Sequence, residues 1–140
     1  EAYRATLRRH GIAPDPALEI DGDYTMERGE AAMPEFLALD PRPSALFASN
    51  DISAFGALRG LRAAGLEVPD DLALAGFDDI QLARFSSPTL TTVRAPVQEM
   101  GEAAIARLRA RMTGDASGPP EQVLFPTELV VRDSTPRWDG

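Results

Sequence analysis

The sequence contains no cysteine and only one histidine among its 140 residues. The lack of cysteine excludes a disulfide framework, a thiolate nucleophile and a zinc–thiolate site. The single histidine, His10, argues against a catalytic triad or a histidine-bound metal. Its place before Gly11 is typical of a helix C-terminus, where a cation is favoured. We therefore expect neither a metal nor a cofactor, and the cysteine-free composition fits a cytoplasmic location.

Basic residues are also scarce, because 14 of them stand against 22 acidic residues, for a net charge of −8. A nucleic-acid module is normally basic, so this chain by itself should not hold DNA. The sequence has no run of 18 apolar residues, and it therefore predicts no membrane span. It opens at Glu1 on a helical pattern without a signal peptide, from which we expect a segment of a longer protein.

Several catalytic motifs are missing as well. The sequence has no G-x-x-x-x-G-K-[ST] phosphate loop, no glycine-rich dinucleotide turn and no G-x-S-x-G elbow. Three carboxylates, Asp51, Asp78 and Asp79, leave open a magnesium site or an acid–base pair, because magnesium sites use one or two carboxylates. Their spacing alone selects neither, and we expect a protein that is not an enzyme.

Helical and extended patterns alternate along the first 94 residues. Helical patterns cover about 3–10, 25–39, 52–64 and 97–112, with one or two further turns at 80–85. Apolar or β-branched runs predict strands at 18–20, 44–48, 72–77, 90–94, 123–125 and 129–131. The alternation predicts an α/β fold with a parallel sheet and helices on both faces, in three layers, αβα.

Three details of this pattern can be tested separately. The strand at 44–48 is continuously apolar, which is typical of a strand buried on both faces. Pro34 interrupts the helical pattern at 25–39 and predicts a kink or an early break there. The tail at 134–140 is expected to be loose, with Trp138 as a residue that docks it.

Polar residues follow two of the predicted buried strands. Asn50 and Asp51 come after the strand at 44–48, while Asp78 and Asp79 come after the strand at 72–77. Ligands of open α/β sheets bind outside the carboxyl ends of the strands, so these residues predict one shared site. The alternative is that they cap helices, which Asp and Asn also favour.

Tyr24 follows the turn Asp21-Gly22-Asp23 at another predicted strand end. Its ring offers a flat face and a hydroxyl, so that with Asn50 and Asp78 it fits a ligand rich in hydroxyl groups. The alternative is a partly buried aromatic residue of a loop. Of these residues, the sequence therefore predicts that Asn50, Asp78 and Tyr24 bind the ligand.

Six blocks carry a family resemblance by their order and spacing. They are PSALFASND at 43–51, AFGALR at 54–59, GLEVPDDL at 65–72, GFDDI at 76–80, PTLTTVR at 88–94 and EMG at 99–101. Together they resemble the effector domain of lactose- and galactose-repressor-type (LacI/GalR) transcription regulators, over about residues 1–131. Each block alone is weak, but the series is specific.

The resemblance implies a two-lobed, periplasmic-binding-protein-like fold of type I, of which this chain is the C-terminal part. Residues 1–94 would form the C-terminal lobe, and 95–126 would be a crossover segment that belongs to the N-terminal lobe. Residues 127–133 would return to the C-terminal lobe, and 134–140 would form a tail. In the family the helix at 97–112 packs on the other lobe, so here we expect it to dock on a partner chain or fold back.

The resemblance also assigns roles to residues. Asn50, Asp78 and Tyr24 match positions that contact the effector, a sugar or related small metabolite. The family's arginine contact would precede Glu1, and Ala95 stands where a glutamine is usual. A homodimer is implied through Ile52, Phe55, Leu82 and Phe85; Leu82 and Phe85 lie in a polar stretch where apolar side chains would otherwise be exposed.

The function implied is effector binding and dimerisation in a LacI-type transcription regulator. Operator DNA would be contacted only through an N-terminal domain outside this chain. The alternative is the periplasmic sugar-binding protein of an ABC transporter, which would carry an export signal and work as a monomer.

Overall fold

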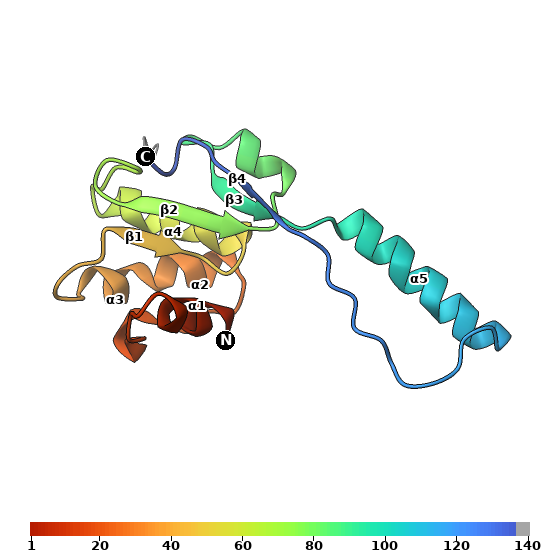
Figure 1. The fold of residues 1–140 in the computed structure, drawn as a ribbon. Coiled ribbons are helices and arrows are strands. Elements are labelled where there is room, and N and C mark those ends of the chain that lie inside the picture. Colours follow the sequence, from red (N-terminus) through yellow and green to blue (C-terminus); the bar gives the residue numbers. More distant parts are fainter. Residues whose placement is uncertain (137–140) are drawn as a thin grey trace.

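The computed structural model describes residues 1–136, which form a four-stranded sheet with helices on both sides (Figure 1). In chain order the elements are α1 Ala2–Arg9, the 3-10 helix η1 Pro16–Leu18, α2 Met26–Ala31, α3 Met33–Leu37, β1 Ala45–Phe47, α4 Asp51–Ala63, β2 Ala73–Phe77, the 3-10 helix η2 Gln81–Arg84, β3 Thr91–Arg94, α5 Val97–Thr113 and β4 Glu128–Val130. The strand order is β1-β2-β3-β4; the first three strands are parallel and β4 is antiparallel to β3. The predicted α/β fold with its parallel sheet is thus confirmed.

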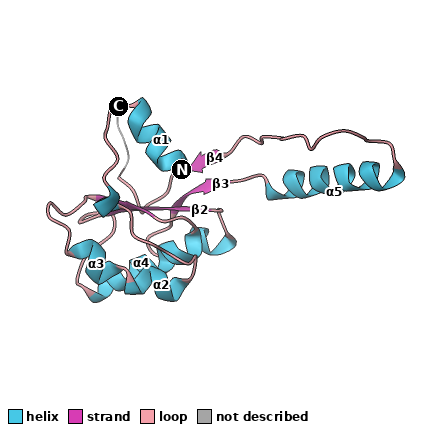
Figure 2. Ribbon diagram, turned by 90° about the horizontal axis from the view of Figure 1, so that it is seen from below, coloured by secondary structure: helices cyan, strands magenta, loops and turns pink. Residues whose placement is uncertain are grey.

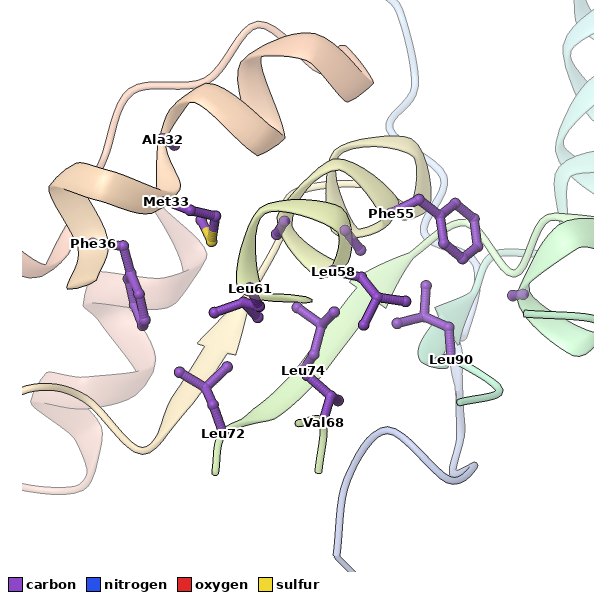
Figure 3. Packing of buried hydrophobic residues seen from close by; sticks show 13 residues of the cluster. Ala32, Met33, Phe36, Phe55, Leu58, Leu61, Val68, Leu72, Leu74 and Leu90 are labelled. Atoms are coloured by element: carbon purple, nitrogen blue, oxygen red, sulfur yellow. The ribbon is translucent and has the colours of Figure 1, made fainter. Parts of the chain in front are cut away.

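The layers are unequal. Figure 2 shows α2, α3 and α4 on one side of the sheet and α1 on the other. The hydrophobic core lies on the α4 side, where Leu58 and Leu61 of α4 lie against Leu74 of β2 and Leu90, the residue before β3 (Figure 3). No residue of α1 is buried, so the layer that α1 forms contributes little to the core.

The close packing of α2 on α4 depends on glycine. A Cβ atom on Gly29 would collide with the carbonyl oxygen of Ser53, and one on Gly56 would collide with that of Met26. Only a residue without a side chain lets the two backbones approach this closely. The contact sets the N-terminus of α2, and thus the loop that carries Tyr24, beside the N-terminus of α4.

Pro34 does break the helical pattern at 25–39, as predicted. The chain forms α2 and α3 with Ala32 between them, and Pro34 stands in the first turn of α3. Proline is tolerated there because the first amides of a helix have no partner within it. Met33 and Phe36 of α3 point into the core.

Two predicted strands are wrong. The strand predicted at 18–20 is absent: Leu18 ends the 3-10 helix η1, and Glu19 and Ile20 belong to no strand. The helix forms because the Asp15 side chain accepts a hydrogen bond from the Ala17 amide (2.9 Å) and Pro16 favours a helical start. Residues 123–125 are not a strand, and within residues 1–136 no strand pairs with them. Without a partner strand, the backbone N–H and C=O groups of these residues have no ladder to join, so a β-branched pattern alone does not make a strand.

The prediction that the strand at 44–48 is buried on both faces is also wrong. Ala45 and Phe47 are exposed, and Phe47 keeps 56% of its surface. Ala45 and Phe47 share one side of the strand, while Leu46 on the other side packs against the core. The first side is left to solvent because α1, the helix on that face of the sheet, buries none of its residues.

The tail is not loose at its start. Ser134 is buried: its amide donates to the Thr89 carbonyl (2.9 Å), and its hydroxyl accepts from the Thr91 amide (2.8 Å) and donates to the Leu74 carbonyl (2.6 Å). Ser134 thus satisfies backbone groups that the sheet leaves unpaired. The predicted docking residue Trp138 lies outside the described residues.

α5 extends away from the rest of the chain (Figure 1), and none of its residues is buried. The expectation that it folds back on this lobe is therefore wrong, because its apolar residues find no neighbouring surface among residues 1–136. Docking on a partner stays a prediction. Within the described part of the chain, no helix has the length and apolar character to cross a membrane.

Candidate functional site

Asn50, one of the predicted ligand contacts, is bonded to a second one, Tyr24. It precedes α4 as the N-cap, and its Oδ1 accepts a hydrogen bond from the Ser53 amide (2.8 Å). Its Nδ2 donates to the carbonyl oxygen of Tyr24 (3.0 Å). The capping interpretation is therefore correct for Asn50, and the same side chain brings the Tyr24 loop to the end of β1.

Tyr24 stands on a braced turn. Asp23 Oδ1 accepts hydrogen bonds from the amide (3.0 Å) and the hydroxyl (2.6 Å) of Thr25, and Thr25 in turn caps α2. Tyr24 itself has φ +67°, a value that residues with a side chain rarely adopt, and is 65% exposed. The alternative of a partly buried loop aromatic does not hold, because the ring lies at the surface.

The loop after β2 separates its two carboxylates. Asp78 has φ +112° and Asp79 has φ +52°, so two consecutive residues adopt a conformation that favours glycine. The Asp78 amide donates to the Val93 carbonyl (2.9 Å), which continues the pairing with β3. As a result Asp78 is exposed at the carboxyl end of β2, while the side chain of Asp79 turns inward.

Asp51 is buried and holds this loop to the sheet. Its Oδ1 accepts from the Thr92 hydroxyl (2.6 Å) and its Oδ2 from the Ile80 amide (2.9 Å). Burial raises the pKa of Asp51 above its ordinary value, against the opposing effect of these two hydrogen bonds. A Cβ on Gly76 would collide with Asp51 Oδ1, so β2 needs glycine here. Asp51 is neither a helix cap nor open to a ligand.

Asp79 is the most heavily paired carboxylate of the site, with a side chain only 1% exposed. Its Oδ2 lies 2.6 Å from Arg94 Nε and 3.5 Å from Arg84 Nη2, and its Oδ1 lies 2.5 Å from Arg132 Nη2. Burial acts to raise the pKa of Asp79, but the hydrogen bonds from Arg132 and Arg94 outweigh it, and the pKa lies below its ordinary value.

These pairings bear on the metal alternative. Protein donors occupy the carboxylates of Asp51 and Asp79, which leaves Asp78 alone open to solvent. Within residues 1–136 no group of three acidic or histidine side chains is arranged to hold a metal ion. The arrangement instead offers the free carboxylate of Asp78 after β2, the capping amide of Asn50 after β1 and the exposed aromatic ring of Tyr24 on the loop before α2. These are groups that bind hydroxyls.

Sequence reasoning missed Arg132 and Thr92. Both bond to Asp79 in the loop after β2. Thr92, 13 residues further along the chain, accepts a hydrogen bond from the Asp79 amide, and Arg132, 53 residues further along, donates one to the Asp79 carboxylate. The only signal in the sequence was Asp79 itself, because a carboxylate at the end of a buried strand requires a counter-charge. Nothing in the local pattern says which arginine supplies it.

A cavity of about 530 Å³ lies beside this site, between η1, α2, α3 and the outer edge of β1. Its walls are mostly apolar and include Leu18, Ile20, Met33, Phe36 and Leu46. Tyr24, Asn50 and Asp78 are not among the described residues that line it. The cavity therefore belongs to the open edge of the sheet rather than to the candidate ligand site.

The four residues predicted at a dimer interface differ in exposure. Leu82 is exposed, Phe85 is 74% exposed and Ile52 is half-buried, whereas Phe55 is only 8% exposed and packs in the core. Leu82 and Phe85 belong to η2 and the residue that follows it. Of the four, these two present the apolar surface that a partner could cover.

Comparison with known proteins gives the family. The model of the periplasmic binding protein-like domain matches residues 1–135. The HTH-type transcriptional repressor CytR of Escherichia coli K12 is 41% identical over 135 residues, which is 96% of this chain and 39% of that protein. The chain thus spans about two fifths of the length of this curated relative. Such relatives are repressors, in agreement with the expectation that the chain is not an enzyme.

Solved structures agree. The regulator CelR in complex with cellobiose has a TM-score of 0.87 and 40% identity, over 94% of this chain and 40% of that one. A LacI family regulator from Enterococcus faecalis V583 with bound ribose has a TM-score of 0.75 and 35% identity, over 83% and 42%. The chain therefore belongs to the periplasmic binding protein-like family, in the form found in the effector domains of LacI-type transcription regulators.

Proposed function

We propose that this chain is the part of a LacI-type transcription regulator that binds a sugar or related polyhydroxy effector, with Asn50, Asp78 and Tyr24 as contacts. The observation that carries the proposal is the strand-end arrangement, in which Asp78 alone of the three neighbouring aspartates is left to solvent. Two similar regulators have been solved with cellobiose and with ribose, which supports the ligand class. The matched relatives are repressors, which favours a role in transcription regulation over a role as the sugar-binding protein of a transporter.

Residues 95–126 take part in this proposal as a crossover to a second lobe, and the effector would bind between the two lobes. The exposed apolar residues of α5 support the assignment, because they need a surface that residues 1–94 do not offer. DNA would be contacted by a part of the regulator outside this chain, whose net charge of −8 disfavours phosphate.

Calorimetry of the intact regulator with cellobiose, ribose and other sugars tests the ligand site. Asp78→Asn keeps the shape of the side chain but weakens its acceptor, and we expect it to cost about 1–3 kcal/mol of binding. Asn50→Asp keeps the helix cap but replaces the Nδ2 donor to the Tyr24 carbonyl with an acceptor, so it should displace the Tyr24 loop and weaken binding without unfolding α4. Asp70→Asn, at an exposed acid on the loop before β2, is the matched control. Parent-like affinity in both site variants would contradict the assignment.

We also propose that the regulator is a homodimer, in which α4 and the stretch around η2 meet a second copy. Leu82 and Phe85 support this, because two exposed apolar side chains in a short polar stretch favour a protein contact. We expect Leu82→Glu and Phe85→Glu to shift the regulator to monomer in sedimentation. Leu124→Glu, at an exposed leucine of the loop after α5, is the control. If both interface variants sediment like the parent, the interface lies elsewhere.

A further inference from the structure

Asp79 lies beside the proposed ligand contact Asp78 but faces the opposite way. Its carboxylate receives Arg94 Nε at 2.6 Å and Arg132 Nη2 at 2.5 Å, in a position closed to solvent. A ligand therefore cannot reach it. The question is what this pair of arginines connects.

The two arginines belong to the two segments of chain that lead from the sheet to α5 and back through β4, called here the crossing segments. Arg94 is the last residue of β3, just before α5, and Arg132 follows β4 after one further residue (Figure 1). Arg94 also donates through Nη1 to Glu128 (2.9 Å), its register partner at the start of β4. Arg132 donates through Nη1 to the Leu90 carbonyl (2.7 Å). One carboxylate thus holds both crossing segments.

The same loop is bonded to β3 through its backbone. The Asp78 amide donates to the Val93 carbonyl (2.9 Å) and the Asp79 amide to Thr92 Oγ1 (3.3 Å). Positive φ values at both residues turn one side chain outward and the next inward. A movement of Asp78 therefore changes the position of Asp79, because packed interiors do not absorb such a shift locally.

We propose that Asp79 is a positioning residue that couples the effector contact at Asp78 to both crossing segments through Arg94 and Arg132. The inference rests on the proposed function, because the crossing segments matter only if they lead to a second lobe. A carboxylate is needed because each of its oxygens receives a different arginine. A neutral amide offers one acceptor and would leave one guanidinium without its partner.

The test measures effector binding and the effector-induced change in operator affinity in the intact regulator. For Asp79→Asn we expect the effector-induced change to shrink by about tenfold, within the usual range of allosteric coupling. Effector affinity itself should fall by less than that, because Asp78 and Asn50 are still present. Arg132→Lys keeps the charge but cannot serve Asp79 and Leu90 together, so it should give an intermediate loss. Arg42→Gln, at an exposed arginine on the loop before β1 that makes no ion pair with Asp79, should behave like the parent.

A second measurement does not depend on the ligand. Hydrogen exchange of the amides in β3 and β4 should speed up by about tenfold in Asp79→Asn and in Arg94→Gln, but not in Arg42→Gln. Arg94→Gln keeps the Arg132 pair and covers the case in which Asp79→Asn does not fold. Parent-like exchange together with parent-like coupling in the folded variants would overturn the proposal. If the parent binds none of the sugars, the proposed function fails and exchange alone decides whether Asp79 holds the two segments.

Discussion

Residues 1–94 and α5 have similar shares of apolar side chains but opposite fates. In the first region Leu61, Leu72, Leu74 and Leu90 are fully buried between α4 and the sheet. In α5 every residue keeps some exposure, including Met100, Ile105 and Leu108. An amphipathic pattern predicts a helix in both regions, but burial stabilises only the one that has a facing surface.

The contrast has a consequence for the site. Asn50, Asp78 and Tyr24 stand on the well-packed region, where Asp51 and Asp79 hold their loops from behind. The strands on either side of α5 are tied to the same region by the ion pairs of Arg94 and Arg132 with Asp79. The ligand side is therefore held by bonds within this chain, while α5 has no facing surface among residues 1–136.

The largest expected effect comes from deleting matched leucines. Leu61 is 0% exposed and Leu108 is 55% exposed. Leu61→Ala should lower the free energy of unfolding of the chain by about 2–5 kcal/mol, through lost burial and the cavity left behind. Leu108→Ala should change it by no more than about 0.5 kcal/mol, the usual range for surface changes. Urea titrations followed by circular dichroism measure both. A similar loss in the two variants would mean that α5 is packed in solution.

In the intact regulator the comparison should change. If α5 docks on a second lobe, Leu108→Ala becomes costly there, and the amides of α5 gain protection from exchange. Parent-like behaviour of Leu108→Ala in both the isolated chain and the regulator would leave the apolar side of α5 without a partner.

Acid offers a smaller and more selective way to loosen the well-packed region. The pKa of Asp79 is lowered in the folded chain, so its contribution to stability is present above its unfolded pKa of about 4 and is lost as pH falls through the folded pKa. The parent should therefore be more stable than Asp79→Asn at pH 6. We expect the difference to shrink steadily below about pH 4. Urea titrations across this pH range measure it. A gap that stays constant down to acid pH would show that the Asn variant is destabilised by shape rather than by charge.

The pKa of Asp51 is shifted in the opposite direction, upward, so Asp51 does not share the acid sensitivity expected of Asp79. Burial raises the pKa of Asp51, so its ionised form costs stability in the folded chain, and acid relieves rather than adds to that cost. Comparing parent and Asp79→Asn removes most of the contribution of Asp51, because the charge of Asp79 is the smallest of the causes that raise the pKa of Asp51.

The sequence predicted the elements whose partners lie nearby and failed where the partner lies far along the chain. The alternation of patterns was enough for β1, α4 and β2, and Pro34 was enough for the break between α2 and α3. The exposure of Phe47 could not be predicted, because it depends on whether a helix covers that face of β1. The burial of Ser134 was missed for the same reason, since its partners are Thr89, Thr91 and Leu74.

The site shows the same division. Strand-end position placed Asn50 and Asp78 after two paired strands, β1 and β2. The carbonyl of Tyr24 is bonded to Asn50, which no local pattern predicts. The roles of Asp51 and Asp79 were not separable in the sequence, where both are acids after a strand. Their difference comes from Thr92 on one and from Arg94 and Arg132 on the other.

The smallest expected effect comes from glycine substitutions in α5, which should change amide exchange in that helix and not in the sheet. Gly114 ends α5 with φ +82°, and Gly101 lies within the helix; a Cβ on either would meet open space. Gly114→Ala should shorten the helix at its end, at a cost of about 1–2 kcal/mol for a left-handed alanine. Gly101→Ala should strengthen α5 by about 0.5–1 kcal/mol, because glycine is a poor interior residue. Exchange of the α5 amides should therefore speed up in the first variant and slow down in the second, while that of β2 stays as in the parent. Should β2 respond to either change, α5 would be coupled to the sheet even without a second lobe, and the separation of the two regions would be wrong.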